Sequence, residues 1–174
     1  MRTLDVVFTR SKKFLPVGSW AIMLWQMRNF SHVAVQWDSA FLERRLTYQA
    51  SHGMVHFENR SLFEKQNLEV AAFTVMVSDD AFKRVNQKCI DKAGVPYAKM
   101  QLLGYALQPI FHRNIFGDGR ASYVCSEIVG EILIDLGVID PQDLDQLMPS
   151  QLYDLLEEAC GKGIVIRRTH GSTT

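Results

Sequence analysis

The stretch Ser122-Tyr-Val-Cys-Ser-Glu-Ile-Val-Gly-Glu-Ile-Leu-Ile-Asp-Leu-Gly137 decides how the rest of the chain is interpreted. Its apolar residues recur at helical spacing, as shown by Val124, Ile128, Ile132 and Leu136. This period predicts one amphipathic helix with an apolar face for the core. Ser122 is expected to cap the start of the helix, and Gly137 is expected to end it in a left-handed conformation.

Cys125 falls in the first turn of this predicted helix. The first backbone N–H groups of a helix have no partner within the helix, and together with the helix dipole they stabilise an anion. A thiol placed there is expected to have a lowered pKa, which increases the fraction of the nucleophilic thiolate. The alternative is a small buried cysteine on a core helix, because free cysteine is among the most buried residue types. Both interpretations stay open from this stretch alone.

Composition places the chain among globular proteins. It has 174 residues, of which 47% are hydrophobic, and this suffices for one domain over 1–174 with a sizeable core. The tail, about 169–174, is small and polar and is expected to be flexible. Lysine plus arginine and aspartate plus glutamate number 19 each, so the formal net charge is zero. This balance argues against broad electrostatic binding to nucleic acid.

The three cysteines, Cys89, Cys125 and Cys160, form no CxxC pair and show no metal-ligand spacing. We therefore expect no metal site and no cofactor. An odd number of cysteines suits a reducing compartment better than a disulfide framework. The chain shows no secretory signal, and its N-terminal apolar run is too short to cross a bilayer. These features predict a cytoplasmic protein without an integral membrane segment.

Periodicity and turn signals divide the chain into strands and helices, which predicts the α+β class. Strands are expected over residues 5–9, 31–37, 46–50, 54–58, 68–77 and 162–167. Helices are expected over residues 19–27, 79–93, 98–107, 122–136 and 150–159. The segment 51–53 is short enough to join two antiparallel strands as a hairpin. Residues 109–119, just before the cysteine helix, are expected to form a loop that acts as a lid or sets specificity.

A cysteine nucleophile needs a base within hydrogen-bond reach and a third group that orients the base. Five histidines are candidates for the base. His32 opens a predicted strand, which holds a side chain more rigidly than the loop around His112 or the tail at His170. His32 is equally compatible with a histidine that only fills the core or the edge of the sheet.

The residues that compete to orient His32 are Gln49, His52 and His56. His52 lies at the predicted turn, where a side chain is poorly held, and His56 lies on the return strand, one strand further away. We therefore expect Gln49 to accept a hydrogen bond from one ring nitrogen of His32, which leaves the other nitrogen facing the cysteine. Because side chains alternate along a strand, this choice turns Tyr48 to the opposite face.

Four motifs occur in one order between about residues 5 and 150. They are Ser31-His-Val-Ala-Val35, Tyr48-Gln-Ala50 followed by Gly53-Met-Val55, Gly94-Val-Pro-Tyr97, and Tyr123-Val-Cys-Ser-Glu-Ile-Val129. This order resembles the circularly permuted papain-like amidases of the YiiX/YaeF type, a branch of the NlpC-like cysteine peptidases. In that branch the histidine strand precedes the cysteine helix, the reverse of papain. The resemblance implies a small antiparallel sheet packed against helices, with the nucleophile at a helix N-terminus.

The resemblance also implies roles for individual residues. Cys125 matches the nucleophile, and His32 matches the general base. Gln49 stands where the family has a polar residue, often glutamate, and a glutamine can still accept a hydrogen bond from imidazole. Tyr97 matches a tyrosine near the cysteine, and we assign Tyr97 and Tyr123 to binding of the substrate or the oxyanion.

The activity that the resemblance implies is hydrolysis of an amide bond through an acyl-thioester intermediate. The relatives suggest a small peptide or a cell-wall peptide as substrate, and the apolar residues at 20–27 suit an acylated substrate. One alternative is an acyltransferase of the lecithin:retinol acyltransferase-like type, although an Asn-Cys-Glu box is typical there and this chain has Val-Cys-Ser. Another alternative is a non-enzymatic binding module on the same fold. The sequence does not indicate the oligomeric state.

Overall fold

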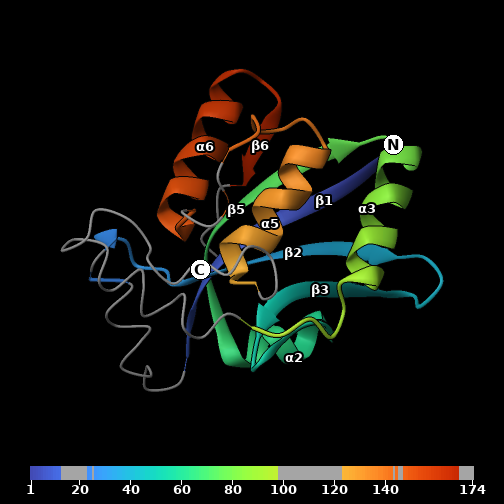
Figure 1. Cartoon of the computed structure of the whole chain (residues 1–174), viewed down its shortest axis with the longest axis horizontal. Coiled ribbons are helices and arrows are strands. Elements are labelled where there is room, and N and C mark those ends of the chain that lie inside the picture. The colour runs from blue at the N-terminus through green and yellow to red at the C-terminus, as the bar shows by residue number, and fades with distance from the viewer. Residues whose placement is uncertain (13–22, 25, 98–122, 143, 145–146, 169–174) are drawn as a thin grey trace, which may run out of the picture.

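A six-stranded sheet forms the centre of the computed structural model, which describes residues 1–12, 23–24, 26–97, 123–142, 144 and 147–168. The strands are β1 (Arg2–Ser11), β2 (His32–Ser39), β3 (Arg44–Ser51), β4 (Met54–Asn59), β5 (Asn67–Val77) and β6 (Val165–Arg168). They lie in the order β4-β3-β2-β1-β5-β6, and each neighbouring pair is antiparallel (Figure 1). The helices of the described residues include α2 (Arg60–Gln66), α3 (Asp79–Asp91), α5 (Cys125–Asp135) and α6 (Pro149–Gly161). The fold is therefore of the predicted α+β class.

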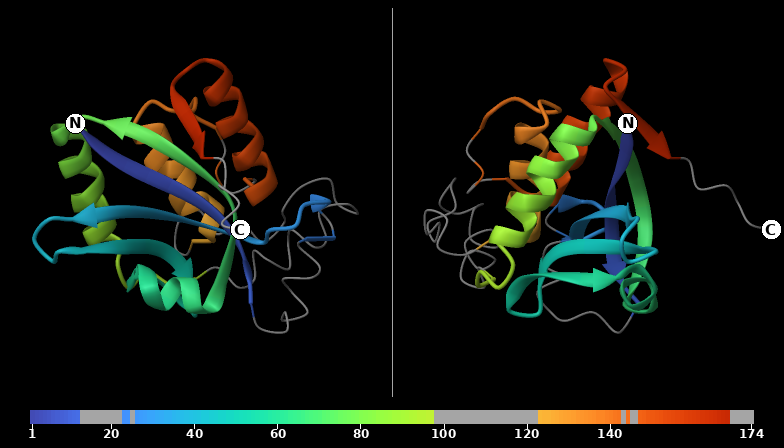
Figure 2. Two further views of the ribbon diagram at one scale, coloured as in Figure 1. Left: turned by 180° about the vertical axis from the view of Figure 1, so that it is seen from behind. Right: turned by 90° about the vertical axis from the view of Figure 1, so that its right-hand side faces the viewer.

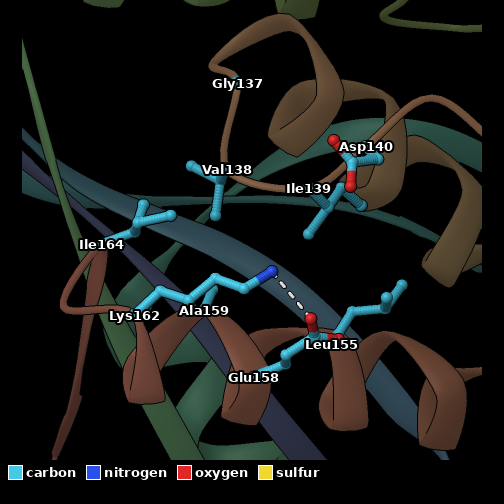
Figure 3. A pocket seen from close by; sticks show the side chains of 9 residues that line it. All are labelled: Gly137, Val138, Ile139, Asp140, Leu155, Glu158, Ala159, Lys162 and Ile164. Atoms are coloured by element: carbon cyan, nitrogen blue, oxygen red, sulfur yellow. Dashed lines mark ion pairs between the residues drawn. The ribbon is translucent and has the colours of Figure 1, made fainter.

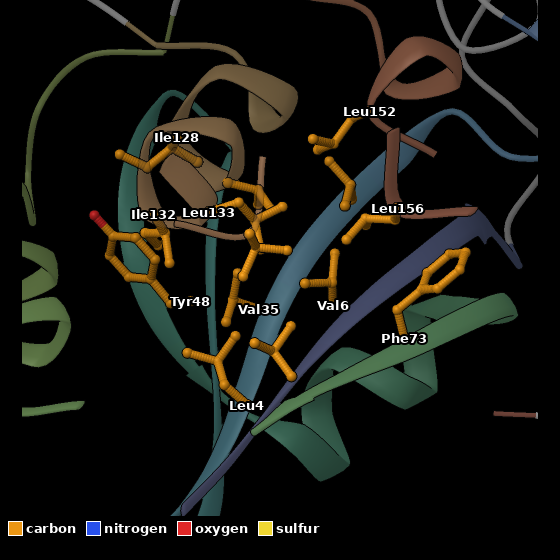
Figure 4. Packing of buried hydrophobic residues seen from close by; sticks show 14 of the residues in the cluster. Leu4, Val6, Val35, Tyr48, Phe73, Ile128, Ile132, Leu133, Leu152 and Leu156 are labelled. Atoms are coloured by element: carbon orange, nitrogen blue, oxygen red, sulfur yellow. The ribbon is translucent and has the colours of Figure 1, made fainter. Parts of the chain in front are cut away.

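Helices cover both faces of the sheet (Figure 2). The larger group, α3, α5 and α6, packs on one face, and α2 packs on the other. In the larger core, Val6, Val35 and Phe73 of the sheet lie under Leu133 of α5 and Leu156 of α6 (Figure 4). Burial of apolar surface between these layers supplies the main driving force for the arrangement.

Alternation along β2 assigns each of its side chains to one face. Val33 and Val35 are buried in the larger core, whereas Ala34 belongs to the small cluster around Phe63 of α2. Successive side chains of a strand point to opposite faces, so His32 shares the α2 face with Ala34. The ring centroids of His32 and Phe63 lie 6.3 Å apart, which agrees with this placement. The α2 face therefore carries the candidate base.

A two-residue turn, formed by His52 and Gly53, connects β3 to β4. Their φ angles are 50° and 98°, and two successive positive φ angles suit a tight hairpin because they match the twist of the strands. The predicted hairpin is confirmed. Its register includes the pairs Ser51↔Met54, Gln49↔His56 and Thr47↔Glu58.

The α2 face of the sheet is lined by polar side chains that are nonetheless buried. They include Asp5, Thr9, Gln36, Thr47 and Gln49. A buried polar group costs free energy unless it is hydrogen-bonded. Asp5 is the charged member, and it accepts hydrogen bonds from Thr74 at 2.6 Å, from Arg168 at 2.9 Å and from Arg45. The Asp5 carboxylate therefore links β1 by hydrogen bonds to β3, β5 and β6.

Replacing Asp5 with alanine is expected to lower the free energy of unfolding by about 3 kcal/mol, because both arginines lose the carboxylate between them. Urea unfolding followed by circular dichroism measures this change. The matched control is Asp79→Ala, since Asp79 also pairs with two cations but its side chain is 58% exposed, so a much smaller loss is expected. Equal losses in the two variants would contradict this role of Asp5.

The structure also differs from the sequence-based expectations. The sequence does not predict α2, which has only 7 residues and begins with the Asn59 side chain accepting from the N–H of Ser61. A helix this short shows no helical period. The expected helices over 19–27 and 98–107, the loop over 109–119 and the tail over 169–174 lie wholly or largely outside the described residues.

The two ends of the described chain, β1 and β6, belong to the same sheet. The single domain over 1–174 stays a prediction. None of the helices in the described segments is long and apolar enough to cross a membrane.

Candidate active site

α5 begins at Cys125, so the cysteine lies in the first turn of the helix, as predicted, although the helix starts later than the expected residue 122. Val124 precedes it in an extended conformation, and its backbone N–H donates to Glu127 Oε2 at 3.0 Å. This bond satisfies a backbone donor at the start of the helix. The expectation that Ser122 caps the helix is wrong, because Val124 occupies the N-cap position and the helix begins one residue later. Gly137, with φ of 67°, follows the helix in the predicted left-handed conformation.

The N-terminal part of α5 is held by the segment that leads into α6. Ser126 Oγ donates to the backbone carbonyl of Leu147 at 2.6 Å. Gly130 allows the segment to approach, because a Cβ atom there would lie 2.6 Å from Leu147 Cδ2 and 3.0 Å from Leu144 Cδ2. A buried hydrogen bond and close packing therefore fix the end of the helix that carries Cys125.

The Cys125 side chain is buried, with 4% of the residue exposed, and shares the larger core with Val33 and Ile128. Burial raises the pKa of the Cys125 thiol to about 11, whereas the backbone N–H groups of Val33, Ser126 and Cys125 itself act to lower this pKa. The expectation of a lowered thiol pKa is wrong, because desolvation outweighs the stabilisation that the helix N-terminus gives to the anion.

His32 lies at the start of β2 and is hydrogen-bonded to Gln49 of β3. The distance between His32 Nε2 and Gln49 Oε1 is 2.8 Å, so the contact expected from the sequence is present. Gln49 is 2% exposed, and its Nε2 atom donates to Glu58 Oε2 at 2.8 Å. His56 Nε2 lies 3.4 Å from the same Gln49 nitrogen. Strands β2, β3 and β4 thus carry a connected chain of polar side chains on the α2 face.

Burial lowers the pKa of His32 to about 4. The hydrogen bond to Gln49 acts to raise this pKa, and the nearby His52 and His56 act to lower it further. The ring is therefore neutral near pH 7, which is the protonation state that a general base requires. With the thiol also neutral, the resting site holds no thiolate–imidazolium pair.

The structure places Cys125 and His32 toward opposite faces of the sheet. α5 packs on the face that carries Val33 and Tyr48, whereas His32 and Gln49 point to the α2 face. No hydrogen bond joins Cys125 to His32 within the described part of the chain. The predicted proximity of the sulfur to a ring nitrogen of His32 therefore stays a prediction. Strand alternation predicts which side chains share a face, but it does not predict the face on which a distant helix packs.

The two residues nevertheless flank the same peptide unit. The N–H of Val33 lies close enough to the Cys125 sulfur to affect the pKa of the thiol, and this N–H shares one peptide plane with the carbonyl of His32. The pairing of β2 with β3 begins only at Val35↔Tyr48. Backbone N–H groups point along the plane of a sheet, so a sulfur beside this N–H lies near that plane and not deep above one face.

Tyr97 and Tyr123 form an isolated parallel bridge just before α5. Burial raises the pKa of Tyr97, and electrostatic interactions with Cys125 and Glu127 add to this effect. Tyr123 is arranged differently, because its hydroxyl accepts a hydrogen bond from Lys92 at the end of α3. This bond links the start of α5 to α3.

Cys89 and Cys160 are free thiols, like Cys125. Cys89 is 1% exposed on the apolar side of α3, and burial raises the pKa of its thiol to about 12. Cys160, at the end of α6, is half-buried, and its pKa is raised first by burial and then by Glu157. Among the cysteines, Cys160 is therefore the most accessible to a small reagent.

A cavity of about 100 Å³ lies at the far end of α5 (Figure 3). Val138 and Ile139 line one side of it, and Leu155 of α6 lines the other. About three helical turns separate this cavity from Cys125, at the opposite end of the same helix. The cavity is therefore not where a substrate would meet the sulfur.

Glu58 is the site residue that sequence reasoning misses. Its place follows from the two-residue turn: if Ser51 pairs with Met54, Gln49 falls opposite His56, and Glu58 lies two residues further along the same face. Diagonal neighbours on antiparallel strands are within reach of long side chains. The signal that finds Glu58 is thus the hairpin register combined with strand alternation.

Comparisons with known proteins give a likeness in fold. No protein-family model matches the chain, and no curated protein matches it. A solved structure, that of the metalloprotein YiiX from Escherichia coli O157:H7, superposes with a TM-score of 0.57 at 21% sequence identity. The match covers 94% of this chain and 84% of that one. The chain therefore has a YiiX-like fold.

Proposed function

We propose that this protein is a cysteine hydrolase that cleaves an amide bond through an acyl-thioester on Cys125. The observation that carries the proposal is the position of the sulfur, at the first residue of a helix and beside the backbone N–H groups of Val33 and Ser126. N–H groups that converge on one point stabilise the anion that forms during acyl transfer. The proposal assigns Tyr97 as a further donor, because Cys125 and Glu127 contribute to the raised pKa of its hydroxyl.

In the proposed reaction, the sulfur attacks the carbonyl carbon of the amide while its proton passes to His32. The accepting nitrogen is Nδ1, since Nε2 is bound to Gln49. Because no hydrogen bond joins the sulfur to His32 among the described residues, the proposal requires one water molecule to carry the proton between them, which general-base catalysis allows. His32 then protonates the leaving amine, and water hydrolyses the thioester to restore the thiol.

The proposed substrates are small peptides, cell-wall peptides or acylated molecules. All of them carry an acyl group on nitrogen or oxygen, which is the group that a cysteine nucleophile takes up. The formal net charge of zero gives the protein no general attraction for polyanions, so recognition is expected to depend on local contacts around the sulfur.

YiiX is described as a metalloprotein, which raises the question of whether residues of this chain fit a metal ion. Among the described residues, no group of three or more His, Cys, Asp or Glu side chains is able to hold one. His32, His56 and Glu58 do not form a ligand set either, because the amide of Gln49 lies between them and contacts all three. The described residues do not fit a metal, so no step of the proposed mechanism passes through one.

Acylation by activated esters tests the proposed function. p-Nitrophenyl acetate and p-nitrophenyl octanoate offer a short and a long acyl group with the same leaving group. We expect a burst of p-nitrophenolate equal to the amount of protein, and an acyl group on the sulfur of Cys125, located by mass spectrometry. Iodoacetamide is the control reagent, because simple alkylation follows exposure and should modify the half-buried Cys160 first.

The fate of the acyl group separates the possible outcomes. Release of the acyl group into water supports a hydrolase. Release that occurs only when an alcohol or amine is added would instead indicate an acyltransferase. Acylation of Cys160 without acylation of Cys125 would overturn the proposal.

One observation favours a second candidate, a binding module without activity. The Cys125 thiol is buried, and its pKa is raised to about 11. A thiol of this kind often serves only as a small hydrophobic side chain. This candidate predicts a folded protein that gives no burst with either ester and carries no acyl group on Cys125.

A further inference from the structure

We propose that Glu58 is a positioning residue that determines which nitrogen of His32 carries the proton, and that it acts through the amide of Gln49. The inference rests on the proposed hydrolase function, because it identifies the free base of that reaction. Its basis is a chain of hydrogen bonds from β4 across β3 to β2. The direction of each hydrogen bond in this chain follows from which of its two atoms is able to donate.

Glu58 fixes the orientation of the Gln49 amide. An ionised carboxylate accepts hydrogen bonds and cannot donate them. Glu58 Oε2 lies 2.8 Å from Gln49 Nε2, so the amide must present its NH2 group to β4 and its carbonyl oxygen to β2. The opposite orientation would place two acceptors against each other and leave a buried donor without a partner.

His56 supports the same orientation from the neighbouring position. His56 Nδ1 lies 3.2 Å from the carbonyl oxygen of Met54, and a carbonyl oxygen only accepts. The His56 proton therefore resides on Nδ1, which leaves Nε2 as an acceptor 3.4 Å from Gln49 Nε2. The NH2 group of Gln49 thus faces two acceptors, of which Glu58 is the closer.

The orientation of Gln49 in turn selects the tautomer of His32. Gln49 Oε1 lies 2.8 Å from His32 Nε2, so this nitrogen must carry the proton. The neutral ring then has an unprotonated Nδ1. Nδ1 is bonded to Cγ and therefore lies nearer to the β2 backbone than Nε2 does, and the N–H of the next residue, Val33, approaches the Cys125 sulfur. The selected tautomer leaves the basic lone pair on Nδ1, the ring nitrogen that does not contact Gln49.

Nuclear magnetic resonance of the full chain with 15N-labelled histidine reads the tautomer directly, because protonated and unprotonated ring nitrogens differ in chemical shift. The His32→Ala variant identifies the His32 signals by their loss. At neutral pH we expect the wild-type ring in the Nε2–H form. If the His32 ring of the wild-type protein carries its proton on Nδ1, this result alone overturns the proposal.

Substitutions at Glu58 test its role against a matched control. An ammonium only donates, so Glu58→Lys is expected to turn the Gln49 carbonyl toward β4 and to invert the His32 tautomer to Nδ1–H. Glu58→Gln keeps an acceptor oxygen and should keep the Nε2–H form. Glu64→Lys makes the same charge change on the neighbouring α2, where Glu64 pairs with Arg60, and should leave the tautomer unchanged. An Nε2–H ring in Glu58→Lys would overturn the proposal.

Acylation of Cys125 by the p-nitrophenyl esters gives a second readout. Glu58→Lys is expected to slow acylation by about 10- to 100-fold, and Glu58→Gln by much less. If no variant is ever acylated, the hydrolase proposal fails, while the tautomer measurements still decide the role of Glu58. If Glu58→Lys does not fold, Glu58→Ala takes its place and should give a mixture of tautomers, so a pure Nε2–H ring there would equally overturn the proposal.

Discussion

Turnover by the Cys125→Ala variant is expected to fall by about 10⁴-fold or more, to the level of the uncatalysed reaction. Alanine carries no nucleophile, so no acyl group can be held beside the N–H groups of Val33 and Ser126. The variant should stay folded, because the loss of one buried heavy atom costs about 1 kcal/mol. Release of p-nitrophenolate beyond the first equivalent measures turnover, and urea unfolding measures stability.

Cys89→Ala is the matched control for this experiment. Cys89 is buried in the same core as Cys125, but it lies on α3 and away from the start of α5. Its replacement should cost a similar amount of stability and leave turnover unchanged. If Cys125→Ala and Cys89→Ala hydrolyse the ester equally fast, Cys125 is not the nucleophile.

Local sequence patterns predicted one link of the polar chain on the α2 face, the hydrogen bond between His32 and Gln49, but not Glu58. His32 and Gln49 lie on neighbouring antiparallel strands, and alternation alone decides that Tyr48 turns away from them. The His52–Gly53 turn then fixes the register of the next strand. These relations hold between residues that are close in sequence, so they depend little on how the rest of the chain packs.

The surroundings of Cys125 depend instead on contacts between distant parts of the chain. Periodicity predicts that Cys125 lies in the first turn of a helix, but the face of the sheet that receives α5 is decided by packing against residues such as Val33 and Tyr48. The thiol pKa depends on the same packing. A helix N-terminus stabilises an anion by about 1 kcal/mol, whereas full burial shifts a pKa by up to about 3–5 units, so burial decides the sign.

The His32→Ala variant is expected to lower turnover by about 10²- to 10⁴-fold, because it removes the group that takes the thiol proton and returns it to the leaving group. The nucleophile remains, so some acylation should persist at high pH, where hydroxide replaces the base. His52→Ala is the matched control, since His52 lies at the exposed β3–β4 turn and does not contact Gln49. Similar losses in the two variants would contradict the role of His32.

The pH dependence of kcat/KM is expected to follow the protonation of the His32 ring. Burial lowers the pKa of His32 to about 4, so the free enzyme keeps a neutral base well below pH 6.5. We expect kcat/KM to decline on the acid side only near pH 4, because this ratio reports the pKa values of the free enzyme. A decline centred near pH 6.5 would show a solvent-exposed ring instead of the half-buried His32 of this structure.

Stability gives an independent check on the same pKa. Between pH 6.5 and about 4, the unfolded chain binds a proton at His32 that the folded protein does not bind. The unfolded state therefore gains protons as the pH falls, and the free energy of unfolding decreases by about 1.4 kcal/mol per pH unit from this residue alone. The His32→Ala variant should lack this component of the slope. If its stability falls as steeply over the same interval as that of the wild type, the buried neutral imidazole is not the source of the acid sensitivity.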